Sequence, residues 1–229
     1  MFDLDGTLCD PREGIIGCLR YSLDQLGYSS PPDDQLERYI GPPLYDSFAT
    51  LLGSNDSQLI EKAVGLYRQR FTSNGMYENK VYAGIPDTLA TLQSRNYRLH
   101  VVTSKPTVFA ARVVVHFGLQ RLFRNIYGSE LDGSRSDKGE LIAHVLSEEK
   151  ILASDAIMVG DREHDIKGAL ANGVFPIGVL WGYGTREELT GADAALLCES
   201  PEALVYSLCS RSLLKPVAPR ISDRKEGQP

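Results

Sequence analysis

The chain has 229 residues, of which 42% are hydrophobic and 24% are charged. These proportions are typical of a soluble globular protein and argue against a wholly disordered, collagenous or coiled-coil chain. The formal net charge of −6 argues against a general binder of nucleic acids or of anionic membranes. The apolar runs are far shorter than the roughly 20 residues that span a bilayer, so no membrane partner is expected.

Four scattered cysteines show neither a disulfide framework nor the spacing of a zinc site. At the start of the chain, Asp3 and Asp5 stand where a signal peptide would need a basic and then an apolar stretch. Reduced thiols and the missing signal pattern predict a cytoplasmic protein.

Residues 1–5 are predicted to form a first strand, and residues 11–79 then show helical patterns without strand patterns. Pro11 begins a helix that Asp10 caps, and its apolar face carries Ile15, Ile16, Leu19, Leu23 and Leu26. A second long helix covers residues 59–71, and the intervening residues 38–48 are rich in Gly, Pro and aromatic residues. Residues 11–79 are therefore predicted to form a small helical domain.

From residue 80 onward, strand patterns alternate with helical patterns. Strands are expected in 97–103, 126–127, 156–160 and 174–180, and helices over 85–95, 106–117, 138–149 and 162–172. This alternation predicts an α/β core with a parallel sheet covered on both faces, formed by residues 1–10 and 80–212. Residues 213–229 are predicted to be a flexible tail, because the last fourteen residues contain three prolines and no aromatic residue.

Two pairs of acidic residues follow predicted strands. Asp3 and Asp5 alternate along an extended segment and so point to the same side, and Gly6 permits a sharp turn after them. Asp161 follows the strand at 156–160, and Asp165 lies one helical turn later on the same face. Either pair by itself could be an acidic turn or a helix cap.

Hydroxyl and amino groups are expected near these acids. Thr103 and Ser104 end one predicted strand, where free backbone amides suit an oxyanion. Lys138 begins a helix, a position that the helix dipole disfavours unless an anion lies nearby, and Lys105 is the alternative lysine. Ligands of open parallel sheets bind at the carboxyl ends of the strands. Clustered acids without Cys or His ligands favour Mg²⁺, and a metal beside these donors predicts a phosphoryl site.

The order DLDGT, VVTSK, Lys138 and GDREHD resembles the motifs of the haloacid dehalogenase-type phosphatases. The resemblance covers residues 1 to about 209 and is closest to the phosphoglycolate phosphatase-like branch. It implies a Rossmann-like three-layer core with a parallel sheet, an α-helical cap formed by residues 11–79, and dependence on Mg²⁺.

The resemblance also assigns roles to residues. Asp3 would be the nucleophile that forms an aspartyl-phosphate, and Asp5 the general acid and then the base. Mg²⁺ would be held by Asp3, the backbone carbonyl of Asp5, Asp161 and Asp165. The phosphoryl oxygens would be held by Thr103, Lys138 and the backbone amide of Ser104.

The expected function is Mg²⁺-dependent hydrolysis of a small phosphorylated metabolite by a monomer or homodimer that acts on no nucleic acid polymer. The inner face of the cap is expected to carry Arg12, Arg38, Tyr39, Gly41 and Pro42, by position alone. Three alternatives stay open. They are a 5′-nucleotidase in which Tyr39, Tyr45 or Phe48 stacks on the base, a sugar-phosphate phosphatase or phosphotransferase, and a catalytically silent metal-binding scaffold.

Overall fold

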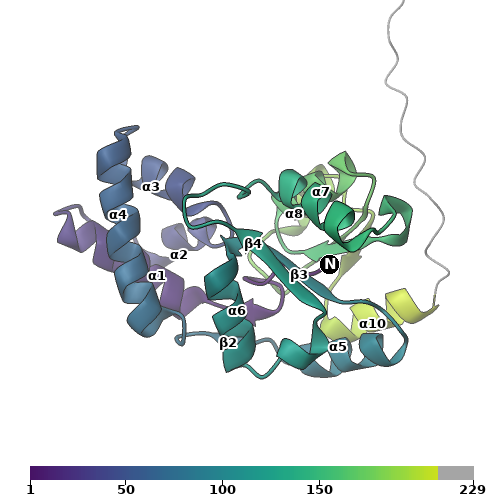
Figure 1. The fold of residues 1–229 in the computed structure, drawn as a ribbon. Helices are drawn as coiled ribbons and strands as arrows, with labels where there is room; N and C mark the ends of the chain where they lie inside the picture. The colour runs from purple at the N-terminus through teal and green to yellow at the C-terminus, as the bar shows by residue number, and fades with distance from the viewer. Residues whose placement is uncertain (211–229) are drawn as a thin grey trace, which may run out of the picture.

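The computed structural model describes residues 1–210, and the predicted tail at 213–229 lies outside the described residues. Figure 1 shows two parts, a group of helices near the start of the chain and a sheet covered by helices. The first part contains α1 (Arg12–Gln25), α2 (Asp33–Leu36), α3 (Leu44–Leu52) and α4 (Ser57–Arg70), with a short π-helical turn at Phe71–Gly75.

The parallel sheet has two halves that the start of the chain joins. One half pairs β3 (His100–Pro106) with β4 (Asn125–Ser129), and the other contains β5 (Ile157–Gly160), β6 (Phe175–Val179) and β7 (Leu196–Cys198). Phe2 bridges Val101 of β3 and Val159 of β5 in parallel register. The expected first strand is thus a central segment of three residues, and it places Asp3 at the carboxyl end of the sheet.

Neighbouring residues of the strands point into two separate cores. Val101 and Val159 belong to a core with α5 (Ile85–Ser94), α6 (Thr107–His116) and α10 (Pro201–Ser210). Val102 and Met158 belong to a second core with α7 (Lys138–Glu149) and α8 (Glu163–Ala171). Because side chains alternate across a strand, helices cover both faces of the sheet. The predicted three-layer α/β core is confirmed.

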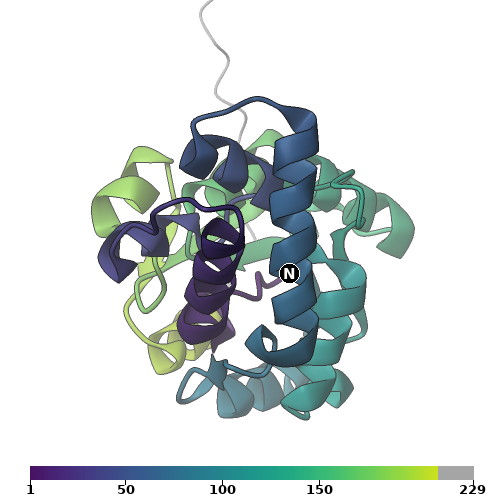
Figure 2. The same ribbon diagram turned by 90° about the vertical axis from the view of Figure 1, so that its left-hand side faces the viewer.

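The buried side chains of the helical part belong to the same core as Val101 and Val159. Figure 2 shows α1 and α4 side by side. The ring of Phe48 lies 6.2 Å from that of Tyr67, which stacks on Phe71 at 5.7 Å. Phe48 is fully buried in this cluster, so it cannot reach a substrate base as the nucleotidase alternative allowed.

The structure contains short strands that the sequence did not predict. One pair lies where the chain enters and leaves the helical part, and β7 lies at the edge of the sheet. β1 (Cys9–Asp10) pairs antiparallel with β2 (Lys80–Val81), so the chain enters and leaves the helical part side by side. The division into a core and a cap at residues 11 and 79 stays a prediction. Among residues 1–210, the helices are too short or too polar to cross a bilayer.

Candidate active site

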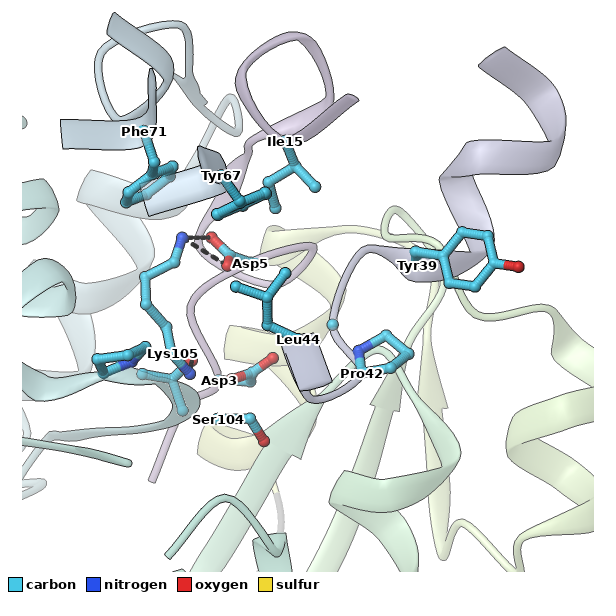
Figure 3. Close-up of a pocket in the computed structure, with 13 residues that line it drawn as sticks. Asp3, Asp5, Ile15, Tyr39, Pro42, Leu44, Tyr67, Phe71, Ser104 and Lys105 are labelled. Carbon is cyan, nitrogen blue, oxygen red and sulfur yellow. Dashed lines mark hydrogen bonds and ion pairs between the residues drawn. The ribbon is translucent and has the colours of Figure 1, made fainter. Parts of the chain in front are cut away.

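Asp3 and Asp5 are buried and line one cavity between the sheet and the helical part (Figure 3). The cavity has a volume of about 80 Å³. Its sheet side is lined by Asp3, Asp5, Thr103, Ser104, Lys105 and Pro106, and its helical side by Ile15, Tyr39, Gly41, Pro42, Leu44, Tyr67 and Phe71. The two predicted catalytic acids therefore share a wall opposite the predicted cap.

The turn after these acids packs directly on Asp161. Gly6 has a φ of +81°, and a side chain at this position would collide with the Asp161 carboxylate. The hydroxyl of Thr7 donates a hydrogen bond to Asp161 Oδ1 at 2.9 Å. Glycine is thus required here both by the backbone conformation and by the close approach.

Three buried carboxylates form a cluster at this end of the sheet. Asp3, Asp161 and Asp165 each offer an oxygen, and these oxygens lie within 4.8 Å of one another. Burial and then the nearby acids raise the pKa of Asp161 to about 8. Burial also raises the pKa of Asp165 to about 6, although Lys138 opposes this. So many buried oxygen ligands fit a hard divalent cation, which would relieve their mutual repulsion.

Lys138, the first residue of α7, lies among these acids. Its ammonium group donates to Asp3 Oδ1 at 2.9 Å and to the backbone carbonyl of Val102 at 3.0 Å, and it lies 2.8 Å from Asp165 Oδ1. Burial alone lowers the pKa of Lys138, but Asp165 and Asp3 outweigh it and raise the pKa above the ordinary value. The position of Lys138 at the start of a helix predicted a nearby anion. The carboxylates of Asp3 and Asp165 supply part of that negative charge.

Lys105 contacts the other acid of the first motif. Its Nζ lies 2.6 and 2.7 Å from the two carboxylate oxygens of Asp5 and 5.0 Å from the centre of the Phe71 ring. Burial raises the pKa of Asp5, and Lys105 partly offsets that increase. Each candidate lysine therefore faces a different carboxylate, and which of them binds phosphate stays a prediction.

Thr103 and Ser104 lie beside Asp3 in the same wall. Thr103 is buried, and its hydroxyl accepts a hydrogen bond from the backbone N–H of Lys105 at 3.3 Å. The Ser104 hydroxyl donates to the backbone carbonyl of Ser136 at 3.1 Å, so this side chain anchors the loop before α7. Their binding of phosphate stays a prediction.

The segment 181–184, which the sequence analysis did not single out, closes over Asp161. The backbone N–H of Tyr183 donates to Asp161 Oδ2 at 2.9 Å, and the indole of Trp181 donates to the carbonyl of Thr7 at 3.0 Å. A side chain at Gly182 or Gly184 would collide with Asp161. The sequence WGYG contains no charged side chain, so only its two glycines could have indicated that this segment packs closely against another part of the chain.

The residues expected on the inner face of the cap divide into two groups. Tyr39, Gly41 and Pro42 line the cavity, although the Tyr39 ring lies at its edge with its hydroxyl directed away from Asp3 and Asp5 (Figure 3). Arg12 and Arg38 do not line it, which corrects that expectation. Arg12 forms an exposed ion pair with Glu37 at 2.5 Å, and exposed Arg38 lies over the ring of Tyr39. Each guanidinium group therefore contacts a neighbouring side chain on the outer surface and does not reach the cavity.

Comparisons with known proteins agree with this geometry. The family model described as haloacid dehalogenase-like hydrolase matches residues 1–179. A 5′-nucleotidase of Pseudomonas aeruginosa is 47% identical over 204 residues, which cover 89% of this chain and 92% of that protein. Tyrosine-protein kinase PtkA of Mycobacterium tuberculosis is 38% identical over 187 residues, covering 82% of this chain and 63% of that protein.

A solved structure has a similar fold. The crystal structure of a predicted phosphatase from Clostridium acetobutylicum has a TM-score of 0.88 and 40% sequence identity, and the match covers 92% of this chain and 97% of that one. Phosphoglycolate phosphatases are also among the relatives, so the predicted resemblance is confirmed. The chain belongs to the haloacid dehalogenase-like hydrolase family.

Proposed function

We propose that this phosphatase hydrolyses a small-molecule phosphomonoester through an aspartyl-phosphate on Asp3. The observation that carries the proposal is the position of Asp3, buried at the carboxyl end of the central segment, with Lys138 on one oxygen and the cavity beside it. In the first step an Asp3 oxygen bonds to phosphorus, the bond from phosphorus to the leaving oxygen breaks, and Asp5 gives that oxygen its proton. In the second step water attacks the phosphorus, Asp5 takes the proton from the water, and the bond from Asp3 to phosphorus breaks.

Asp5 suits this double role because of its surroundings. It lines the same cavity as Asp3, and burial raises its pKa, which favours the protonated form that the first step needs. Lys105 touches both oxygens of Asp5 and so holds the carboxyl group in one orientation. Phosphoryl oxygens would be bound by Thr103, the backbone amide of Ser104 and Lys138.

A divalent cation fits the cluster of three buried carboxylates, and we propose that it is Mg²⁺. Asp3, the backbone carbonyl of Asp5, Asp161 and Asp165 would hold it, because hard oxygen ligands suit this ion. When bound, Mg²⁺ supplies positive charge that offsets the repulsion between a phosphate dianion and the carboxylate nucleophile. The segment 181–184 and Thr7 keep the Asp161 carboxylate oriented toward the cluster.

The helical side of the cavity favours a leaving group that is neutral and partly apolar. Ile15, Leu44, Tyr67 and Phe71 line it, and that side contributes no cationic residue among those described. The carboxylate of a glycolate leaving group would need such a cation, whereas a nucleoside would not. A 5′-nucleotidase function is therefore favoured over phosphoglycolate hydrolysis, and the relative from Pseudomonas aeruginosa bears that name.

The test is phosphate release from a panel of phosphomonoesters, with Mg²⁺ and with EDTA. The panel holds nucleoside monophosphates, phosphoglycolate, sugar phosphates and phenyl phosphate, and also a nucleoside triphosphate because one relative is named a kinase. We expect magnesium-dependent release, fastest from nucleoside monophosphates. Strong preference for phosphoglycolate would overturn the nucleoside assignment, and silence across the panel would favour the scaffold alternative.

A further inference from the structure

Arg162 of the GDREHD motif contacts the helical part. It follows Asp161 directly, and its Nη1 donates a hydrogen bond to the backbone carbonyl of Ile40 at 2.8 Å. Ile40 follows the 3₁₀ turn Glu37–Tyr39 and is fully buried. Arg162 itself does not line the active-site cavity. Its contact with the helical part is therefore a contact with the backbone beside that cavity.

The segment 39–42, which this hydrogen bond reaches, forms part of the cavity wall, and we call it the wall loop. Tyr39, Gly41 and Pro42 line the helical side of the cavity, and Figure 3 shows Tyr39 and Pro42 there. Gly41 has a φ of +104°, and a side chain at this position would lie 3.3 Å from Arg162 Cγ. The backbone of the wall loop thus rests directly on the Arg162 side chain.

The wall loop has little other polar support. Its backbone makes one turn, in which the N–H of Ile40 donates to the carbonyl of Glu37 at 3.0 Å. Within residues 1–210, the hydrogen bond from Arg162 is the only one that a side chain makes to this loop. The other residues of the helical wall lie on α1, α3, α4 and the π-helical turn, which pack against one another. The position of the wall loop therefore depends on Arg162 more than the rest of that wall does.

Glu188 holds the Arg162 side chain in the orientation that reaches the wall loop. It lies in the first turn of α9 (Arg186–Gly191). Its Oε1 accepts hydrogen bonds from Arg162 Nε and from the backbone N–H of Glu163, both at 2.9 Å. The side chains of Arg162 and Glu188 are only 13% and 21% exposed, so water screens this ion pair weakly. With Nε fixed by Glu188, the planar guanidinium presents Nη1 to Ile40.

We propose that Arg162 is a positioning residue that holds the wall loop in place against the leaving group of the substrate. This inference rests on the proposed phosphatase function and extends it to specificity. A leaving group that touches the wall loop binds better when the loop is already ordered, because binding then orders fewer groups. A leaving group of a few atoms does not reach the loop and gains nothing from it. Arg162 therefore favours large leaving groups such as nucleosides over small ones.

The experiment compares Arg162→Met with the unchanged protein on cytidine monophosphate and on acetyl phosphate, whose leaving group is acetate. The variant lowers the ratio of kcat/KM for cytidine monophosphate to that for acetyl phosphate about tenfold, chiefly through KM. The matched control is Arg186→Met, which leaves the ratio unchanged, because exposed Arg186 pairs with Glu199 and not with the helical part. Arg162→Lys keeps the cation beside Glu188 but offers a single nitrogen, so it also lowers the ratio and replaces Arg162→Met if that variant does not fold.

A second measurement does not depend on turnover. Hydrogen exchange followed by mass spectrometry compares peptides that contain the wall loop with peptides that contain Val101 and Val102 of β3. Arg162→Met speeds exchange in the wall loop about tenfold and leaves exchange in β3 unchanged. If the unchanged protein hydrolyses neither substrate, the proposed function fails, and this measurement still decides whether Arg162 holds the loop.

Three results would overturn the inference. Equal losses on both substrates would mean that Arg162 supports the reacting centre through neighbouring Asp161 and not the wall loop. An unchanged ratio would mean that the position of the loop does not select the leaving group. Unaltered exchange of the wall loop in the Arg162 variants would mean that other contacts hold it.

Discussion

The two walls of the active-site cavity are built from different chemistry. The sheet side carries buried ionic groups with fixed partners, such as Asp3 with Lys138 and Asp5 with Lys105. The helical side carries apolar and aromatic groups, such as Leu44, Tyr67 and Phe71. Directional contacts hold a charge at one place, whereas apolar contacts accept many shapes. The sheet side therefore suits a reaction common to all substrates, and the helical side suits the choice among leaving groups.

The largest effect is expected at the centre of the sheet side, from Asp3→Asn. The amide cannot act as the nucleophile, so turnover of every phosphomonoester falls at least about a thousandfold. The fold is retained, because the change removes one negative charge from a buried acidic cluster. Phosphate release and circular dichroism measure the two properties. Substantial magnesium-dependent turnover by the variant would remove Asp3 from its proposed role.

The next effect concerns the metal. Asp161→Asn removes a charged ligand, so the Mg²⁺ concentration for half-maximal activity rises at least about a hundredfold. A second readout is independent of turnover: Mg²⁺ raises the melting temperature of the unchanged protein and has little effect on the variant. Exposed Asp155→Asn is the control and behaves like the unchanged protein. An identical magnesium titration for both variants would place the metal elsewhere.

The acidic cluster also predicts how stability depends on pH without metal. The pKa values of Asp161 and Asp165 rise from 3.8 to about 8 and about 6 in the folded protein. Between about pH 4 and pH 8 these two carboxyl groups therefore bind more protons in the folded than in the unfolded state, and their contribution to stability falls as the pH rises. The buried amino terminus and His100, whose pKa values burial lowers to about 5 and about 4, contribute in the opposite direction. Urea unfolding in EDTA at several pH values, compared between the unchanged protein and Asp161→Asn, isolates the contribution of the cluster.

Two controls test the origin of this pH dependence. Asp161→Asn should gain stability relative to the unchanged protein as the pH rises from 5 to 8, because the carboxyl group with the largest raised pKa of the cluster no longer titrates. Excess Mg²⁺ should stabilise the unchanged protein more strongly as the pH rises, because the ion binds the ionised carboxylates of the folded state. The same pH dependence of stability in EDTA for both proteins would contradict the raised pKa of Asp161.

On the helical side, a single substitution should alter the choice of substrate. Leu44→Lys places a cation on a wall that has none among the described residues. We expect kcat/KM for phosphoglycolate, relative to that for nucleoside monophosphates, to rise about tenfold. Leu44→Met is the uncharged control of similar length and keeps the ratio near that of the unchanged protein. A parallel change for both substrates would show that this wall does not select the leaving group.

The smallest effect is expected from Arg38→Ala. Arg38 lies on the exposed surface over Tyr39 and outside the cavity, so kcat and KM stay within about twofold for all substrates. Steady-state kinetics on cytidine monophosphate and phenyl phosphate measure this. A selective rise of KM for the nucleotide would return Arg38 to the substrate-facing surface that its position in the sequence suggested.

The sequence by itself determined the family, the parallel α/β core and the acids that lie together at the end of the sheet. Asp3 and Asp161 could be placed together because each follows a strand, and parallel strands end at one edge of the sheet, while Asp165 lies one helical turn after Asp161.

Only the tertiary structure decided which lysine faces which acid, where the arginines point and what lies beyond the reacting centre. Lys105 contacts Asp5 and Lys138 contacts Asp3, a pairing that depends on how separate strands and helices pack. Arg12 and Arg38 face outward, whereas Arg68 reaches across to Leu131. The edge of a parallel sheet is fixed by local chain direction, but the inner face of a helical insert depends on long-range packing that residue spacing does not encode.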